Sequence, residues 1–72
     1  MIVKSQNGDS IINFETTRMF YISRRGKNYG ITSDPGGDAG EYSTREAAKT
    51  ILNQILEAYV RGEKVIELPS YF

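Results

Sequence analysis

The stretch YSTREAAKTILNQILEAYVRG, residues 42–62, has the pattern of one amphipathic helix. Its apolar residues recur at three- and four-residue steps, which is helical and not strand periodicity. No glycine or proline interrupts the pattern before Gly62, which suits the left-handed position just past a helix end. We therefore expect one helix over about residues 43–61. This helix is the candidate to pack against the short apolar segments in the rest of the chain and bury them.

Both ends of the predicted helix carry stabilising signals. Ser43 and Glu46 have the spacing of a capping box, in which the Ser43 hydroxyl accepts from the N–H of Glu46 and the Glu46 carboxylate accepts from the N–H of Ser43. In the last turn, the helix dipole favours a cation such as Arg61. Glu57 precedes Arg61 by four residues, so we expect these two side chains to form an ion pair.

The apolar arc of this helix is wider than one core requires. It spans roughly 180°, whereas a single core-facing stripe needs little more than about 100°. Leu56 and Val60 lie at its edge. Either these two side chains lap over the rim of a sheet, or this flank of the helix packs against a second copy of the chain.

The rest of the chain predicts short strands separated by turns. Asn7-Gly8 favours a type I′ hairpin turn, Gly30 favours a bulge or a close approach of another backbone, and residues 34–38 predict a loop with little local structure. The predicted strands are residues 2–5, 11–14, 18–24, 29–33, 40–42 and 65–68. We expect a single α+β domain over residues 1–72, an antiparallel meander of four to five strands packed by one helix, with a short C-terminal strand.

Alternation in the third predicted strand places apolar groups on both of its faces. Phe20 and Ile22 share one face, and Met19 and Tyr21 share the other. One helix covers only one face of a sheet. The second face is therefore expected to be exposed, paired with another subunit or used for binding.

Composition narrows the classes of function. The chain has 72 residues, no cysteine and no histidine, so disulfides and Cys/His zinc sites are excluded, and oligomerisation remains the open route to extra stability. Nine basic and nine acidic residues cancel, which argues against coating nucleic acid by bulk charge. No apolar run approaches the roughly 20 residues of a membrane span, and the start lacks a signal-peptide layout. We expect a cytoplasmic protein.

The residues for conventional catalysis are missing. Without histidine or cysteine, neither a Ser-His-Asp nor a Cys-His arrangement can be built, and the glycines match no phosphate-binding fingerprint. Asp34, Asp38 and Glu41 gather acidic oxygens that suit a hard cation, but their spacing is not that of an EF-hand and a plain loop explains them. We expect no enzymatic activity, no catalytic residue, no cofactor and no metal.

A basic and aromatic cluster in the predicted 18–29 hairpin is the main candidate for binding. Arginine forks grip phosphate and aromatic rings stack on bases, so the combination suits a nucleotide or another small anion. The alternative is a solvated hairpin whose cations protect a sheet edge from aggregation. The candidate ligand- or partner-binding residues are Arg18, Tyr21, Arg24, Arg25, Lys27 and Tyr29.

The N-terminus of the predicted helix is a weaker candidate for an anion site. Its free N–H groups at Ser43 and Thr44, together with the Arg45 side chain, could hold a phosphate. The predicted capping box already uses some of those donors.

Both ends of the chain resemble a group of small uncharacterised proteins encoded by phages and prophages of Gram-positive bacteria. The resemblance rests on residues 2–8, on residues 40–49 with the apolar positions that follow, and on residues 62–65 with Leu68-Pro69. It implies a bacterial host-cell cytoplasm and a phage accessory role, such as blocking a host defence protein or sequestering a small signalling nucleotide. Residues 18–37 depart from that pattern, and this stretch holds the basic and aromatic cluster.

These observations together predict a non-enzymatic, homo-oligomeric binding protein of phage type with a counter-defence role. Its partner would be a host protein or a small anionic ligand, held at or near the 18–29 hairpin. The alternatives are a nucleic-acid-binding accessory protein and a purely structural assembly component.

Overall fold

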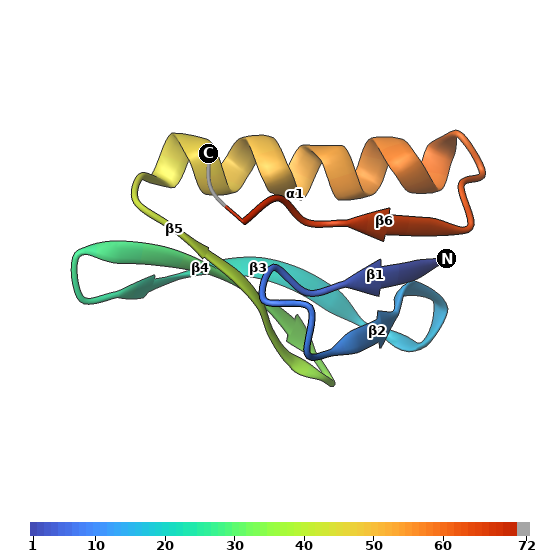
Figure 1. Ribbon diagram of the computed structural model, residues 1–72, viewed down its shortest axis with the longest axis horizontal. Coiled ribbons are helices and arrows are strands. Elements are labelled where there is room, and N and C mark those ends of the chain that lie inside the picture. The colour runs from blue at the N-terminus through green and yellow to red at the C-terminus, as the bar shows by residue number, and fades with distance from the viewer. Residues whose placement is uncertain (71–72) are drawn as a thin grey trace.

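A computed structural model describes residues 1–70 and shows one long helix packed on two small sheets (Figure 1). The elements in chain order are β1 (Ile2–Lys4), β2 (Ile11–Asn13), the 3-10 helix η1 (Phe14–Thr16), β3 (Met19–Arg25), β4 (Asn28–Asp34), β5 (Gly37–Tyr42), α1 (Arg45–Val60) and β6 (Val65–Glu67). The expected α+β class, with a meander, a covering helix and a C-terminal strand, is confirmed. No helix within the described residues is long and apolar enough to cross a membrane.

The strands divide into two three-stranded sheets, not one continuous meander. β3, β4 and β5 form an antiparallel meander, whereas the second sheet has the order β2-β1-β6, with β6 parallel to β1. The division occurs at η1, where the Asn13 side chain accepts a hydrogen bond from the N–H of Glu15 at 3.0 Å. This turn brings Phe14 against Tyr59 of α1, with ring centroids 4.3 Å apart. The chain therefore leaves β2 toward the helix and does not pair β2 with β3.

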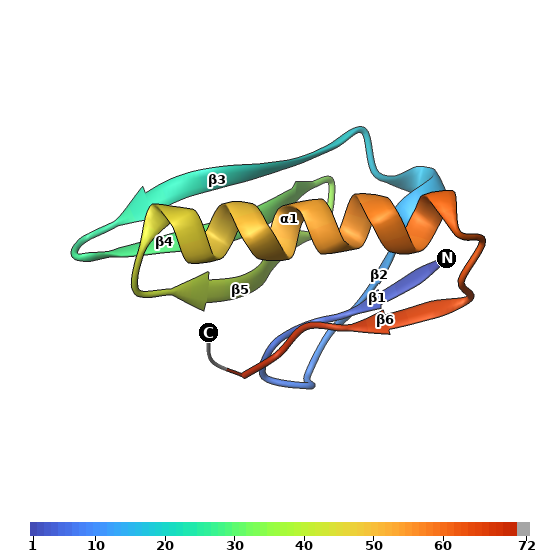
Figure 2. The ribbon, with the colours of Figure 1, turned by 90° about the horizontal axis from the view of Figure 1, so that it is seen from above.

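The core lies between α1 and the two sheets. Seen from above in Figure 2, α1 runs over β4, with β3 on one side and β5 on the other. Val3, Ile31 and Ile51 are completely buried, and Ile55 is 1% exposed. Burial of such side chains supplies the main favourable term in folding, because apolar surface leaves water. Phe20 and Ile22 pack against this core, which confirms that they share the inner face of β3, whereas Met19 and Tyr21 are exposed on the outer face.

The N-cap of the helix lies one residue later than the sequence predicts, and α1 covers Arg45–Val60 where about 43–61 was expected. Thr44, and not Ser43, is the N-cap, and its hydroxyl accepts a hydrogen bond from the N–H of Ala47 at 3.1 Å. The predicted reciprocal box is therefore wrong, because the third residue after the cap is Ala47, which has no carboxylate to return the bond. At the other end Gly62 adopts the expected positive φ of 77°.

Arg61 is the C-cap, and it does not pair with Glu57. Its Nε donates to Glu63 at 2.8 Å. The expected ion pair is thus replaced by one in the following turn, because the chain reverses direction at Gly62.

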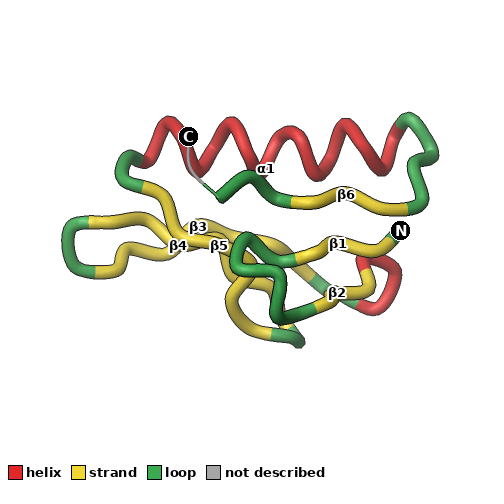
Figure 3. The backbone as a smooth tube through the Cα atoms, viewed as in Figure 1, coloured by secondary structure: helices red, strands yellow, loops and turns green. Residues whose placement is uncertain are grey.

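Two predicted turns also differ from the structure, whose short connections are drawn green in Figure 3. At the first hairpin only Gly8 has positive φ, so the turn is not type I′; it is a longer loop in which the N–H of Ser5 donates to Ser10 at 2.9 Å. Residues 34–38 are not an unstructured loop. β4 extends to Asp34 and β5 starts at Gly37, with a cis peptide bond between Asp34 and Pro35.

Gly30 lies at a close approach, but the neighbour is a side chain and not a backbone. A Cβ atom at this position would lie 2.7 Å from Nε of Arg25, which crosses the sheet surface there. The register shift in this sheet lies at the next step, between Ile31 and Thr32.

Candidate functional site

The structure separates the predicted basic and aromatic cluster onto two faces of the β3–β4 hairpin. Tyr29 packs against the core on the α1 side, opposite Arg24 in the register. Tyr21 and Arg25 alternate with these inner residues and lie on the outer face of the sheet. Lys27 lies exposed in the turn between the strands. The hairpin therefore presents its cations in different directions and does not converge them on one ligand.

Two of the arginines are already paired with carboxylates. Arg18 lies just before β3, and its guanidinium is 3.6 Å from the Asp34 carboxylate. Arg25 makes a two-pronged ion pair with Asp38 and also donates to the Thr32 hydroxyl at 3.1 Å. Hydrogen bonding to Asp38 raises the pKa of Arg25, and the same contact lowers the pKa of Asp38. Among residues 1–70, Arg24 and Lys27 make no ion pair.

The predicted anion site at the helix N-terminus gains no support from the geometry. The Thr44 hydroxyl and carbonyl accept from the N–H groups of Ala47 and Ala48, respectively. Ser43 and Arg45 are exposed, and their side chains form no hydrogen bond with any of residues 1–70. This end of α1 is a capped helix start that faces solvent.

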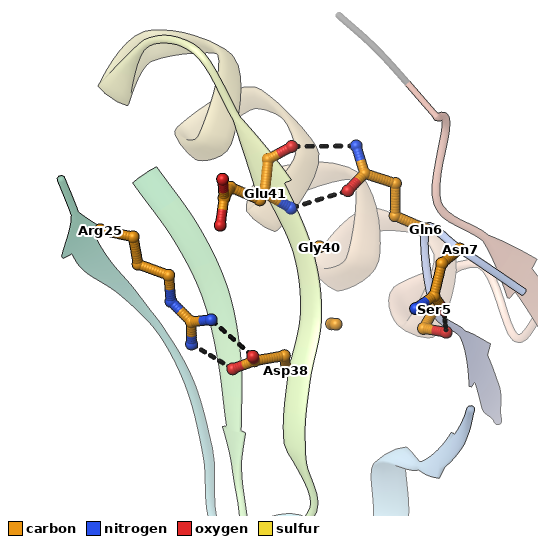
Figure 4. A pocket seen from close by; sticks show the side chains of 8 residues that line it. Ser5, Gln6, Asn7, Arg25, Asp38, Gly40 and Glu41 are labelled. Atoms are coloured by element: carbon orange, nitrogen blue, oxygen red, sulfur yellow. Dashed lines mark hydrogen bonds and ion pairs between the residues drawn. The ribbon is translucent and has the colours of Figure 1, made fainter. Parts of the chain in front are cut away.

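A polar hollow lies where the first hairpin meets β5, and the sequence did not predict it (Figure 4). Its volume is about 170 Å³. The Gln6 side chain forms one wall by donating to the Glu41 carbonyl at 2.9 Å and accepting from the Glu41 N–H at 2.8 Å. No short motif marks Gln6 in the sequence, because its partner lies 35 positions away.

The charged side chains around this hollow are already bound to other residues of the chain. Asp38 is held by Arg25, and the Glu41 carboxylate accepts from Asn28 at 2.7 Å. No group of three or more acidic side chains within the described residues is arranged to hold a metal ion. The hollow thus contains neither a nucleophile with an adjacent base nor a convergent ligand set.

An apolar groove runs between β3 and α1. Its volume is about 260 Å³, and its lining includes no charged residue. The lining residues are Phe14, Phe20, Leu52, Asn53, Ile55 and Leu56. Only Ile55 in this set is fully buried, so the other apolar members, Phe14, Phe20, Leu52 and Leu56, present apolar surface to the groove.

Apolar side chains continue from this groove along the exposed flank of α1. Leu56 is 55% exposed, Tyr59 is 47% exposed and Val60 is 75% exposed. Leu56 and Val60 are the two residues at the edge of the predicted apolar arc, and the sheet rim does not cover them. We refer to Phe14, Phe20, Leu52, Leu56, Tyr59 and Val60 together as the groove surface.

Comparisons with known proteins identify no relative for this chain. A scan against protein-family models found no match, and searches of curated proteins and of solved structures found none either.

Proposed function

We propose that this chain is a non-enzymatic binding protein whose partner is another protein, held on the groove surface. One observation carries the proposal: Leu56 and Val60 expose large apolar side chains next to an uncharged groove. Contiguous exposed apolar surface rimmed by polar residues is typical of protein interaction sites. Aromatic anchors such as Phe14 and Phe20 are the residue types that contribute most to such interfaces.

The hairpin cations favour a protein over a small anion as the partner. A nucleotide site needs several donors directed at one phosphate, whereas Arg18 and Arg25 are occupied by Asp34 and Asp38. Releasing either arginine would break an existing charge-assisted contact. A small anionic or nucleotide ligand, the other partner that the sequence suggests, is therefore the less supported one.

The resemblance of the chain ends to phage-encoded proteins supplies the proposed setting. In that setting the chain acts in the cytoplasm of a bacterial host and binds a host protein, for example to block a defence system. This support is an analogy, because likeness of fold or sequence does not by itself define a function.

Binding to proteins from a bacterial lysate tests this proposal. Immobilised wild-type protein, Leu56→Asp and the control Gln54→Asp are compared by quantitative mass spectrometry, followed by reconstitution with the purified partner. Gln54 lies exposed on α1 outside the groove, so both substitutions add the same charge to the same helix. We expect a specific protein to bind wild type and Gln54→Asp at a defined stoichiometry and to be lost with Leu56→Asp.

Four other results would overturn the proposal. The first is the absence of any protein whose binding depends on Leu56. The second is salt-sensitive binding of oligonucleotides, which would indicate the nucleic-acid alternative. The third is a retained small anion in native mass spectrometry, and the fourth is a large assembly without a partner, which would indicate a structural component.

A second copy of the chain is the other candidate occupant of the groove surface. Analytical ultracentrifugation of the purified protein distinguishes the two occupants. A monomer supports a foreign partner, whereas a dimer that Leu56→Asp dissociates would assign the surface to self-association.

A further inference from the structure

We infer that the partner contributes an extended acidic segment, which adds to the free edge of β3 as a fourth strand. This inference rests on the proposed function and specifies how the groove surface binds. Within residues 1–70, β3 pairs only with β4 and is the edge strand of its sheet. At seven residues β3 is one of the two longest strands, so it offers a long row of backbone donors and acceptors.

The hairpin geometry shows which backbone groups point outward. Gly26 and Lys27 form a two-residue turn between Arg25 and Asn28, which makes those two residues a hydrogen-bonded pair. Hydrogen-bonded pairs recur at every second position of an antiparallel ladder, and the register between β3 and β4 is regular. The N–H and C=O groups of Phe20, Ile22 and Arg24 therefore point away from β4, toward the free edge.

The side chains of these three residues lie on the α1 side of the sheet. Phe20 lines the groove together with Leu52 and Leu56, and Ile22 packs on the same side against the core. A strand that pairs with β3 would place every second side chain on this side, at a spacing of roughly 7 Å. Backbone pairing and the apolar groove would thus be used by one extended peptide at the same time.

Positive charge at one end of the groove selects an acidic partner. Arg45, Lys49, Leu52 and Leu56 follow one another at steps of four, three and four residues. They therefore lie on the same flank of α1. The β3–β4 hairpin tip, which carries Arg24, lies at the same end of the molecule as the start of α1 (Figure 2). All three side chains are exposed. An acidic residue of the partner strand would meet cations there.

The same charges disfavour a second copy of the chain at this edge. Arg18 and Arg25 are paired with carboxylates, but Arg24 makes no ion pair within residues 1–70. Pairing β3 with β3 would bring a second Arg24 onto the rim that already holds Arg24, Arg45 and Lys49. The groove lining offers no carboxylate to offset them. Charge complementarity therefore assigns the edge to a foreign acidic strand.

Synthetic peptides test the inference on the intact protein. The probe is a panel of ten-residue peptides in which leucine or valine alternates with threonine and two aspartates stand at one end or the other; matched peptides carry lysines instead. We expect an acidic peptide to bind in calorimetry, to slow hydrogen exchange at the amides of Phe20, Ile22 and Arg24, and to exceed its lysine counterpart at least about tenfold in affinity.

N-methylation of the peptide separates strand pairing from simple groove docking. Methyl groups on the amides that face β3 should abolish binding, whereas methyl groups on the alternate amides should leave it within about twofold. Equal effects of the two methylation patterns would overturn the inference. The inference would also be overturned if no acidic peptide bound, or if the matched lysine peptides bound as tightly as the acidic ones.

A charge reversal on the protein provides the matched control. Arg24→Glu should weaken the acidic peptide at least about fivefold, whereas Lys64→Glu, which changes the net charge equally beyond the far end of α1, should not. The proposed function stands and this inference fails if a lysate protein needs Leu56 for binding but binds Arg24→Glu as well as wild type, and if the two patterns of peptide N-methylation have equal effects. If neither a Leu56-dependent partner nor any peptide binds, both fail.

Discussion

The carboxamide of Gln6 forms both hydrogen bonds of a strand neighbour with the backbone of Glu41. Its oxygen accepts from the Glu41 N–H at 2.8 Å, and its nitrogen donates to the Glu41 carbonyl at 2.9 Å. The same nitrogen donates to the carbonyl of Ser70 at 2.9 Å, and the Gln6 N–H donates to Ala39 at 2.7 Å. One side chain therefore joins the first hairpin, the free edge of β5 and the end of the described chain.

Gln6→Ala removes these side-chain bonds and should lower the free energy of unfolding by about 1–3 kcal/mol, because two to three hydrogen bonds are lost. Chemical denaturation measures the change. Gln54→Ala is the control, since Gln54 lies exposed on α1. Equal, small losses in the two variants would show that Gln6 does not hold the sheets together.

Thr44→Ala removes the hydroxyl that caps α1 and should lower the free energy of unfolding by about 1 kcal/mol. Ser43→Ala should change it by only a few tenths of that amount, because Ser43 is exposed and is not the cap. Thermal unfolding of the two variants measures the difference. A larger loss with Ser43→Ala would restore the capping box that the sequence predicts.

Ile55 lies at the centre of the core and is 1% exposed. Ile55→Ala should lower the free energy of unfolding by about 2–5 kcal/mol through the lost burial and the cavity, and Ile55→Asp should abolish cooperative unfolding because it buries a charge. Circular dichroism during heating measures both variants. Val60→Asp is the control, since Val60 is 75% exposed, and its melting temperature should stay within a few degrees of wild type. Wild-type melting of Ile55→Asp would contradict this placement of the core.

Tyr42 provides a pH-dependent term in stability. Its side chain is buried and its hydroxyl donates to the Pro69 carbonyl at 3.0 Å, and burial raises its pKa from 10.0 to about 12. The folded state therefore holds this proton more tightly than the unfolded state does. The resulting stability is fully present below pH 10.0 and is lost as the pH rises through about 12.

Denaturation between pH 9 and 12 measures this loss, and Tyr42→Phe is the matched variant because it lacks the ionisable hydroxyl. Stability of Tyr42→Phe should fall less steeply with pH than that of wild type. Parallel profiles for the two proteins would show that another group titrates.

Local sequence patterns correctly predicted those features that depend on residues close together in the chain. The three- and four-residue periodicity of residues 42–62 predicted α1, and the positive φ of Gly62 follows from the end of that pattern. Alternation in β3 predicted correctly that Phe20 and Ile22 face the core. The cap was misplaced by one residue because Glu46, three residues after Ser43, favoured Ser43, whereas Thr44 is also a good capping residue and is the cap in the structure.

The candidate site was predicted only in part. Leu56 and Val60 were identified at the edge of the apolar arc, but Phe14 joined them only because η1 turns the chain toward Tyr59. The basic hairpin residues were grouped by their closeness in sequence. In the structure, strand alternation places them on two faces of the sheet, and Asp34 at the end of β4 and Asp38 in β5 pair with Arg18 and Arg25.

The sequence by itself determined the α+β class and the covering helix, because hydrophobic periodicity acts over a few neighbouring positions. Composition alone determined the absence of disulfides and of histidine or cysteine chemistry. The tertiary structure alone decided that the strands form two sheets, that β6 pairs parallel with β1, and that Gln6 joins the sheets. Those arrangements depend on hydrogen bonds between residues that are distant in the chain. No local pattern encodes such a partner, so only the folded chain brings the free edge of β3 and the flank of α1 together as one surface.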